Sequence, residues 1–322
     1  MKNSIEPKAT ICIPTTRTSR AIDECLDSLE AQSDRSFQVI LVTNIKAPKL
    51  MSRVKTYSFP ITVIKQKRDG LVGAMNDGFD KTTTEYFIRI DDDVVLDTGW
   101  FNNIIKPFDD QKVGGVTGPT LIDDIRRDER DLFSFLKKIE KNILLKKLII
   151  EYLYEDKLYE VSTSLPSGVF TLGSNMKNAI PKKQLIVNNL EACNFAIRSN
   201  LLKKLGGFDD IFTKGLGEYH EADIAMKIQK AGYQIVFHPQ AIAHHHIKRG
   251  ENDTRPDAYH RIQNFIRFYK RHFIIDSLDN LMRFSTNLLV QNCYYMYTGL
   301  KRRDISQLGA IPGTIKGLLS TK

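Results

Sequence analysis

Hydrophobic and polar positions along the first hundred residues follow two alternating patterns. Residues 9–16, 37–44 and 61–66 are short apolar runs rich in β-branched side chains, which predict buried strands. Between the first two runs, apolar residues recur every three or four positions, as on the buried side of an amphipathic helix. Residues 71–80 predict another short helix, and residues 86–90 predict another strand. Strands that alternate with helices in this way indicate βαβ units and a largely parallel sheet.

The second half of the chain returns to this pattern after an interruption. The interruption lies within residues 124–160, where an apolar helical stripe carries lysines largely on its other sides. The stripe consists of Leu132, Phe135, Leu136, Ile139 and Ile143. Residues 189–208 then predict a strand and a helix ended by two glycines, and residues 221–232 predict a further helix. Residues 233–246 predict two short strands joined by a turn, and the chain from Tyr259 onward is expected to be helical and basic.

Composition excludes several classes of protein. The chain has 322 residues, with 47 Lys and Arg against 38 Asp and Glu, so its formal net charge is +9. Its mean hydropathy is −0.29, and no apolar run approaches the roughly 20 residues that span a bilayer. The first residues carry no apolar core, and the four cysteines lie far apart without a CxxC spacing. We therefore expect a globular cytoplasmic protein without a signal peptide, disulfide framework or zinc site, and with an anionic partner.

Three consecutive carboxylates, Asp91, Asp92 and Asp93, follow directly after an apolar strand. Like charges this close repel one another, and the repulsion grows as water is excluded. A divalent cation relieves it, because hard cations bind carboxylate oxygens and often bridge them to substrate phosphates. The alternative is a solvated acidic turn.

A second group of polar residues lies near the predicted helix at 221–232. Glu221 and Asp223 follow a glycine-containing stretch, and either one suits a catalytic base or a partner of the helix dipole. If Ala241 and Ala243 share one strand face, His245 lies on that face too. An imidazole there suits a metal ligand, a phosphate contact or an ordinary surface position.

These features occur together and in an order that resembles family 2 glycosyltransferases of the GT-A fold, especially the rhamnosyltransferase-like branch. The resemblance runs from about residue 9 to about residue 273. It rests on six stretches: ICIPTTRTSRAIDECLDSLEAQ, DGLVGAMNDGF, YFIRIDDDVVLDTGWF, LGGFDD, GLGEYHEADIAMKIQKAGYQIVFHP and AIAHHH. It implies an α/β, Rossmann-like nucleotide-diphospho-sugar transferase fold with a helical insertion at 124–160. The nucleotide-sugar half would span 1–120, the acceptor half 121–255, and a C-terminal helical extension 256–322.

The resemblance also implies roles for individual residues. Donor-binding residues would be Pro14, Thr15, Thr16, Arg17, Asn44, Gly70, Asn76, Asp91 and Asp92. Asp91 and Asp93 match the DxD motif that binds Mn²⁺ or Mg²⁺, and His245 matches a histidine that approaches the metal. Glu221 matches the general base of an inverting transfer, with Asp223 as the second choice. The donor would be a UDP-, dTDP- or GDP-sugar.

Two departures from the family pattern concern the donor. An acidic residue is usual where Thr43 and Asn44 stand, and an arginine is frequent where Met75 stands. Arg17, Lys67 and Arg68 are the candidates to compensate.

The acceptor is expected to be a glycan or a lipid-linked molecule of polysaccharide biosynthesis, bound near Glu191, Asn194 and Glu221. Two basic regions suit anionic lipid headgroups at the inner face of the membrane, or else are solvated faces of ordinary helices. They are the helix at 132–148 and the group Arg261, Arg267, Lys270 and Arg271. Without an RNA- or DNA-binding motif, nucleic acid is not an expected partner.

Two rival functions remain at this point. Asp91-x-Asp93-x-Val95 after an apolar strand also fits the first motif of haloacid dehalogenase-type phosphatases. The departures at Thr43 and Met75 also fit a non-catalytic nucleotide-sugar binder. The complete βαβ region before the motif and the stretches LGGFDD and GEYHEAD argue against the phosphatase. The presence of Glu221, Asp223 and the three consecutive aspartates argues against the binder.

Overall fold

The computed structural model describes residues 6–16, 20–45, 48–122, 135–245, 258–273 and 277–320. Arg17, Leu132 and His246, which the sequence analysis names, lie outside these residues.

An eight-stranded sheet forms the centre of the molecule, in the order β3-β2-β1-β4-β9-β6-β10-β8. Its strands are β1 (Ala9–Thr15), β2 (Phe37–Thr43), β3 (Ile61–Lys65), β4 (Tyr86–Ile90), β6 (Val113–Thr117), β8 (Leu185–Val187), β9 (Asn194–Arg198) and β10 (Gln234–Phe237). The first four are parallel, as the alternating pattern predicts. Strand β9 lies antiparallel between β4 and β6, and β8 is antiparallel to β10, so the complete sheet is mixed. This is the predicted GT-A-like α/β fold.

A second, smaller sheet has the order β5-β11-β7. Its strands are β5 (Val94–Leu96), β7 (Thr120–Leu121) and β11 (Ala243–His245). Strand β5 begins directly after the three aspartates, and β11 pairs with it in antiparallel register. The small sheet therefore brings β11, about 150 residues later in the chain, to the end of β4.

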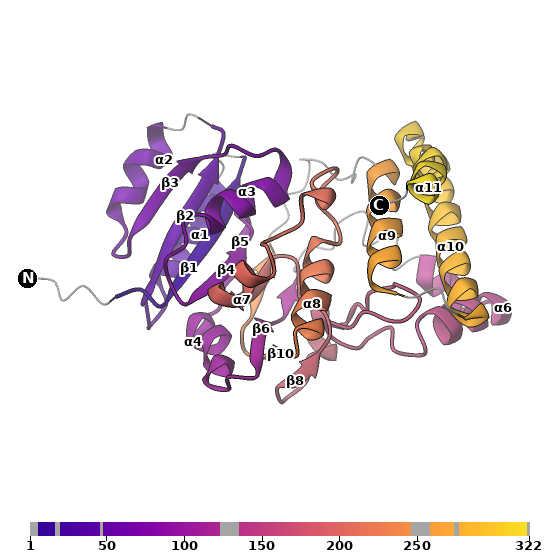
Figure 1. The fold of residues 1–322 in the computed structure, drawn as a ribbon, viewed down its shortest axis with the longest axis horizontal. Helices are drawn as coiled ribbons and strands as arrows, with labels where there is room; N and C mark the ends of the chain where they lie inside the picture. Colours follow the sequence, from indigo (N-terminus) through magenta and orange to yellow (C-terminus); the bar gives the residue numbers. More distant parts are fainter. Residues whose placement is uncertain are drawn as a thin grey trace, which may run out of the picture.

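Helices cover both faces of the large sheet (Figure 1). The helices of the described residues include α1 (Arg20–Glu30), α2 (Pro48–Arg53), α3 (Gly70–Phe79), α4 (Trp100–Ile105), α7 (Ser199–Lys204) and α8 (His220–Lys230), and, beyond these, α9 (Ala258–His272), α10 (Leu278–Arg302) and α11 (Ala310–Leu319). Helix α1 buries Ile22, Cys25, Leu26 and Leu29, the positions that the periodic pattern selects. None of the described helices is long and apolar enough to cross a bilayer.

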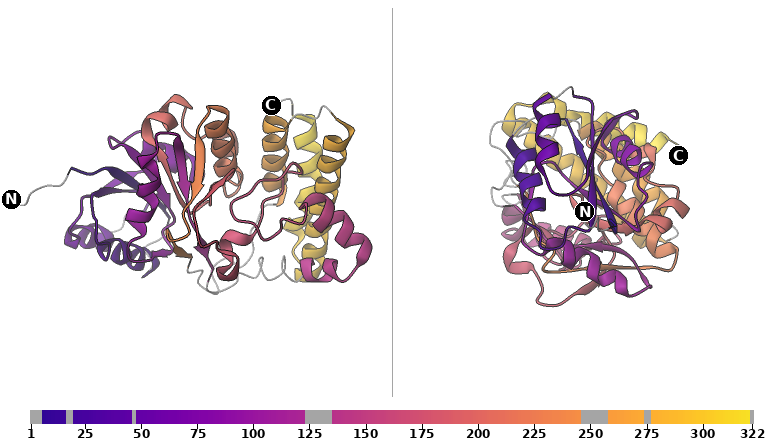
Figure 2. Two further views of the ribbon diagram at one scale, coloured as in Figure 1. Left: turned by 90° about the horizontal axis from the view of Figure 1, so that it is seen from below. Right: turned by 90° about the vertical axis from the view of Figure 1, so that its left-hand side faces the viewer.

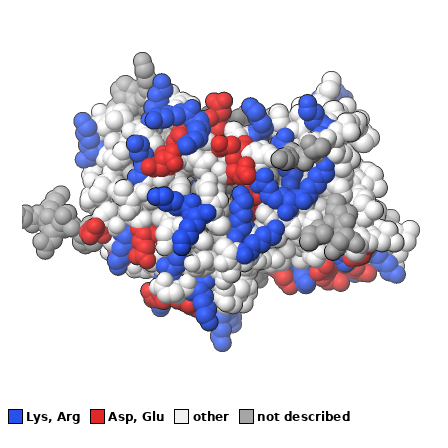
Figure 3. Space-filling view, viewed as in Figure 1, with Lys and Arg blue, Asp and Glu red and all other residues white. Residues whose placement is uncertain are grey.

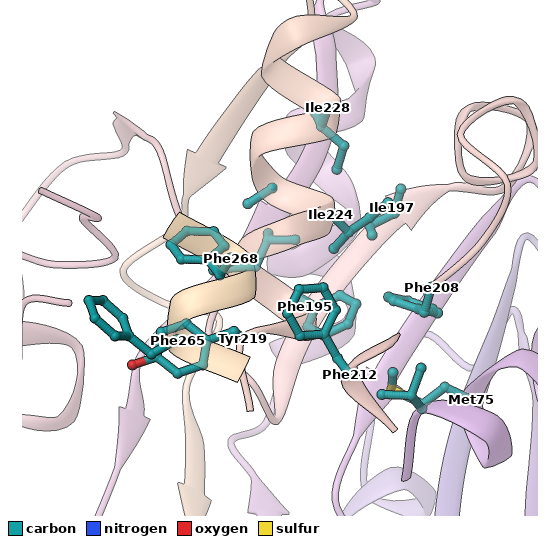
Figure 4. Packing of buried hydrophobic residues seen from close by; sticks show 14 of the residues in the cluster. Met75, Phe195, Ile197, Phe208, Phe212, Tyr219, Ile224, Ile228, Phe265 and Phe268 are labelled. Carbon is teal, nitrogen blue, oxygen red and sulfur yellow. The ribbon is translucent and has the colours of Figure 1, made fainter. Parts of the chain in front are cut away.

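The C-terminal helices are joined to the rest of the molecule through α9. Phe265 and Phe268 of α9 pack beside Tyr219 and helix α8 in the same hydrophobic core as Phe195 of the sheet (Figure 4). Helix α11 lies very close to α9, because a Cβ at Gly313 would come 2.5 Å from the Tyr259 carbonyl oxygen. Helix α10 completes this outer layer of the molecule (Figure 2).

The insertion differs from the single apolar stripe that the sequence predicts. Residues 135–140 are helical and bury Leu136 and Ile139, but Ile143 is 73% exposed. The reason is a break at Asn142, whose side chain accepts hydrogen bonds from the backbone N–H groups of Leu144 and Leu145 and so begins a new helix. That helix, α6 (Ile143–Leu145), continues as a π-helix, η3 (Lys146–Leu153).

Candidate active site

Asp91, Asp93 and His245 meet at the carboxyl end of β4. One ligand atom from each lies within 4.8 Å of the others, and His245 Nε2 is 3.0 Å from Asp93 Oδ1. The register of β11 explains the meeting, because His245 pairs with Val94, the residue after Asp93. His245 is buried, as the strand alternation from Ala241 predicts. Two carboxylates and an imidazole form a donor set that a divalent transition metal can bind.

The electrostatics of His245 reflect these neighbours. Burial alone would lower the pKa of His245, but contacts with Cys193 and Asp93 outweigh burial and raise the pKa to about 10. Without a bound cation the imidazole therefore holds a proton, which offsets the charge of the aspartates, and a cation that binds there displaces this proton.

The carboxyl end of β1 lies beside the same aspartates. Thr15, the last residue of β1, is buried, and its hydroxyl donates a hydrogen bond to the Asp92 carboxylate. Thr15 also pairs in register with Thr43 at the end of β2. Thr16 is exposed next to it. The ends of β1, β2 and β4 thus form one edge, as expected for ligand binding in an open α/β sheet.

Other predicted donor-binding residues are arranged differently. Asn76 accepts a hydrogen bond from the Phe208 N–H and donates one to the Phe208 carbonyl oxygen, at 3.0 and 2.8 Å. Its amide therefore fastens α3 to the 206–210 turn, so Asn76 already has a structural role besides the predicted contact with ribose or phosphate. Asn44 is exposed and contacts Gln66. Gly70 has a φ of +68° at the start of α3, where a Cβ would come 2.6 Å from the Thr213 carbonyl oxygen.

The residues near the two family departures are also engaged. Met75 is fully buried in the core beside Phe208 and Phe212 (Figure 4), so it does not reach the sheet edge. Arg68 forms ion pairs with Asp77 and Asp80, at 2.9 and 2.8 Å. Arg68 is therefore occupied by its own helix, whereas Lys67 is exposed.

Arg89 is a site residue that the sequence analysis missed. It lies in β4 two residues before Asp91, is 1% exposed, and donates a hydrogen bond to the Asp91 carboxylate. Its Nε and Nη1 have no hydrogen-bond partner among the described residues. A buried guanidinium with unused donors is a strong potential binder of an anion. The feature of the sequence that could have revealed it is a single charged residue inside the apolar run YFIRI.

Glu221 lies in the first turn of α8 and is half-buried, with 15% of its side chain exposed. Its Oε2 lies 2.9 Å from His220 Nδ1. Burial alone would raise the pKa of Glu221, but His220 and the Arg89 guanidinium outweigh burial and hold the pKa below its usual range. Glu221 is therefore ionised at neutral pH and can accept a proton.

A second half-buried carboxyl group, Glu191, lies within the electrostatic influence of Glu221. The Ser162 hydroxyl donates to Glu191 Oε1 at 2.8 Å. Burial raises the pKa of Glu191, and the charge of Glu221 raises it further, against the opposing effect of the serine hydrogen bonds. Neighbouring carboxyl groups whose pKa values move in opposite directions are typical of sites that transfer protons.

Asp223 is not placed to act as the alternative base. It is 1% exposed and faces α9, where it contacts His272 Nε2 at 2.7 Å and Arg271 Nη1 at 3.1 Å. Lys227 Nζ lies 2.6 Å away on its own helix. Burial raises the pKa of Asp223, but the hydrogen bonds from His272 and Lys227 outweigh burial and lower it to about 2. Asp223 therefore fastens α8 to α9.

We expect Asp223→Asn to lower the free energy of unfolding by about 2 kcal/mol near neutral pH, because the carboxylate charge that three basic groups share is lost. A carboxyl group with a depressed pKa stabilises the fold above its unfolded pKa and loses this effect as the pH falls. The difference between wild type and variant should thus shrink between about pH 5 and pH 2, which urea unfolding measures. Asp279→Asn is the control, because Asp279 pairs with Arg283 at the same (i, i+4) spacing but is 58% exposed, and it should change stability much less. Equal losses in both variants would contradict this role of Asp223.

Two further groups of predicted residues have partners within the protein. On α9, Lys270 Nζ donates to carbonyl oxygens at the end of α11, and Arg271 pairs with Asp209 and Asp223. Lys270 and Arg271 are nevertheless exposed. Asn194, expected near the acceptor, is fully buried, and it donates to the Pro119 and Ala241 carbonyl oxygens.

Comparison with known proteins shows a family and a fold. The model of the family described as glycosyl transferase family 2 matches residues 10–171. An uncharacterized glycosyltransferase of Rickettsia typhi, RT0329, is 24% identical over 265 residues, which cover 72% of this chain and 83% of that protein. Mannosyltransferase PcManGT from Pyrobaculum calidifontis, solved in complex with GDP-Man and Mn²⁺, has a TM-score of 0.56 at 18% identity, covering 99% of this chain and 89% of its own. GalNAc-T7, solved with UDP, GalNAc and Mn²⁺, has a TM-score of 0.57 at 15% identity, covering 83% of this chain and 48% of its own.

Proposed function

The chain belongs to glycosyl transferase family 2 and is a glycosyltransferase, and we propose that it transfers a sugar from a nucleoside-diphosphate donor by a metal-dependent, inverting reaction. The observation that carries this proposal is the meeting of Asp91, Asp93 and His245 at the carboxyl edge of the sheet. The solved GDP-Man and UDP complexes of the same fold also contain Mn²⁺, which supports a nucleotide-sugar donor and a divalent cation.

The donor set distinguishes between the two candidate cations. Mg²⁺ prefers oxygen ligands and retains its waters, whereas Mn²⁺ accepts carboxylates and an imidazole more readily. We therefore favour Mn²⁺ at Asp91, Asp93 and His245. When bound, the cation would supply positive charge to the leaving diphosphate.

In this proposal Glu221 is the general base. It would take the proton from the acceptor hydroxyl as the hydroxyl oxygen attacks the anomeric carbon opposite the diphosphate. The Glu221 carboxylate is only partly exposed, and Arg89 donates a hydrogen bond to Asp91, where negative charge would develop. No covalent intermediate is required.

The organisation of the chain follows from these roles. Residues 1–120 would bind the nucleotide sugar with Pro14, Thr15, Thr16 and Asp92, and residues 121–255 would bind the acceptor near Glu191. Residues 256–322 form the helical extension. We propose a glycan or lipid-linked acceptor of polysaccharide biosynthesis, in the cytoplasm. The free cysteines among the described residues suit that compartment.

Calorimetric titration with UDP, GDP and dTDP, each with Mn²⁺ or with EDTA, tests the proposal. We expect one nucleotide to bind at least about tenfold more tightly with Mn²⁺, since the cation links diphosphate to the aspartates. The rhamnosyltransferase-like resemblance makes dTDP an important member of the set. Absence of binding by all three, or binding that ignores Mn²⁺, would overturn the proposal. Hydrolysis of a phosphate monoester through Asp91 would instead favour the phosphatase alternative, against which the family match argues.

A further inference from the structure

Helix α10 presents an uncharged face to solvent. From residue 281 to residue 300, every exposed position on this helix is uncharged, and the exposed side chains are Leu281, Met282, Ser285, Leu289, Cys293, Met296 and Leu300. Leu289 is 62% exposed and Leu300 is 76% exposed. These positions recur every three or four residues, so they form one continuous stripe along the helix. Exposed apolar stripes of this length mark binding surfaces.

The stripe continues onto α11. Ile311, Ile315 and Leu318 of α11 are exposed, and a groove of about 550 Å³ between the two helices is lined by Leu281, Leu288 and Leu289 on one side and by Ile311, Ile315 and Leu318 on the other. In the space-filling view, the end of the molecule over α10 and α11 is largely free of charged side chains (Figure 3). The apolar surface therefore spans two helices.

The insertion extends the surface on the opposite side of α10. Val290 and Tyr294 of α10 pack against residues 135–158, with the Phe135 and Tyr294 rings 5.3 Å apart. Leu288, Leu289 and Val290 are consecutive, so the exposed Leu289 lies between the groove and the insertion. Within the insertion, Ile143 and Leu144 are 73% and 75% exposed. We call the exposed apolar residues of α6, α10 and α11 together the outer face.

The surroundings of the outer face are basic. Residues 135–153 contain five basic and two acidic residues, and residues 278–319 contain the same numbers. Lys146 and Lys147 are exposed directly after α6, and Lys316 is exposed between Ile315 and Leu318. Aliphatic side chains bordered by lysines are typical of segments that insert between anionic lipids. A second copy of this chain would bring one basic border against another, which is unfavourable.

We propose that the outer face docks the protein onto an anionic lipid bilayer. Ile143, Leu144 and the exposed leucines of α10 enter the interface, while Lys146, Lys147 and Lys316 contact acidic headgroups. The inference goes beyond the proposed transfer reaction, since it concerns binding that needs neither donor nor acceptor.

Co-sedimentation of the full chain with phosphatidylcholine vesicles, with and without phosphatidylglycerol, tests the inference at low and high salt. We expect binding to phosphatidylglycerol vesicles that high salt weakens. Lys146→Glu/Lys147→Glu and Ile143→Ser/Leu144→Ser should each weaken this binding at least about tenfold. The matched controls, Lys182→Glu/Lys183→Glu and Ile186→Ser, change exposed residues elsewhere and should bind as wild type.

Two results would overturn the inference. One is a failure of the vesicle experiment. In that case the wild type does not sediment with phosphatidylglycerol vesicles at low salt, or the controls lose binding as much as the outer-face variants. The other is a wild-type dimer in analytical ultracentrifugation that Ile143→Ser/Leu144→Ser converts to a monomer, because the outer face would then be a self-association surface. Circular dichroism of each variant establishes that the fold is retained. Since no nucleotide is present, the outcome is independent of the calorimetric test of donor binding.

Discussion

Replacing Glu221 by Gln is expected to lower kcat by about 10²- to 10⁴-fold, the usual contribution of a positioned general base. Gln has nearly the same shape as Glu but cannot accept the proton of the acceptor hydroxyl. The side chain of Glu221 is only 15% exposed and lies beside His220, which leaves little room for water to replace it. Nucleotide affinity measured by calorimetry with Mn²⁺ should stay close to that of wild type, because the charge that holds the diphosphate lies at the end of β4. Steady-state release of nucleoside diphosphate gives kcat.

Two matched variants define what this result means. Glu218→Gln changes a carboxylate three residues earlier, whose Oε2 accepts the Leu216 N–H, and should leave kcat within a few-fold of wild type. Glu191→Gln retains the hydrogen bonds that a carboxyl group with a raised pKa can make, and should lower kcat less than Glu221→Gln does. The pKa of Glu221 is held below its usual range, so Glu221 stays ionised as the pH falls below neutrality. The wild-type rate should therefore fall only at the acidic pH at which Glu221 takes up a proton. Near-normal kcat in Glu221→Gln would move the base to another residue.

Local pattern was enough to predict the framework of this site. The strand before Asp91, the buried side of α1 and the inward direction of His245 all follow from period-2 or period-3.6 spacing within a few residues. The carboxyl ends of β1, β2 and β4 lie together because parallel strands joined by helices must place those ends on one edge. Each of these features depends only on residues close together in the sequence, so one sequence is enough to predict them.

The expectations that changed depend on partners far away in the sequence. Asp223 and Glu221 both lie in the first turn of α8, yet Asp223 faces His272 and Arg271 of α9, about fifty residues later. Asn76 meets the backbone of Phe208 across 132 residues. Spacing on one helix shows which face a residue is on, but not which distant side chain occupies that face. Arg89 was missed for the same reason, since its meaning comes from its burial beside Asp91.

Replacing Asp93 by Ala is expected to abolish metal-stimulated transfer, with a loss of roughly 100-fold or more in kcat/KM. Asp93 lies between the Asp91 carboxylate and His245, so its removal takes one of three ligands and also the hydrogen-bond partner of the imidazole. Two remaining ligands hold a divalent cation poorly. Mn²⁺ binding, followed by electron paramagnetic resonance of the free ion, should weaken in parallel with transfer.

The chain offers a close control for this experiment. Asp97 Oδ1 lies 3.0 Å from His244 Nε2, the same separation that Asp93 Oδ1 has from His245 Nε2. Both histidines lie in β11, and the two aspartates flank β5, the strand that pairs with β11. His244 and His245 are neighbours that point to opposite faces of β11, so only the His245 pair lies with Asp91. Asp97→Ala therefore removes an equivalent histidine–aspartate contact without touching the proposed metal site, and Mn²⁺ affinity should be retained. If Asp97→Ala and Asp93→Ala lose Mn²⁺ equally, the loss comes from the folding of the small sheet. If neither loses it, the cation binds elsewhere.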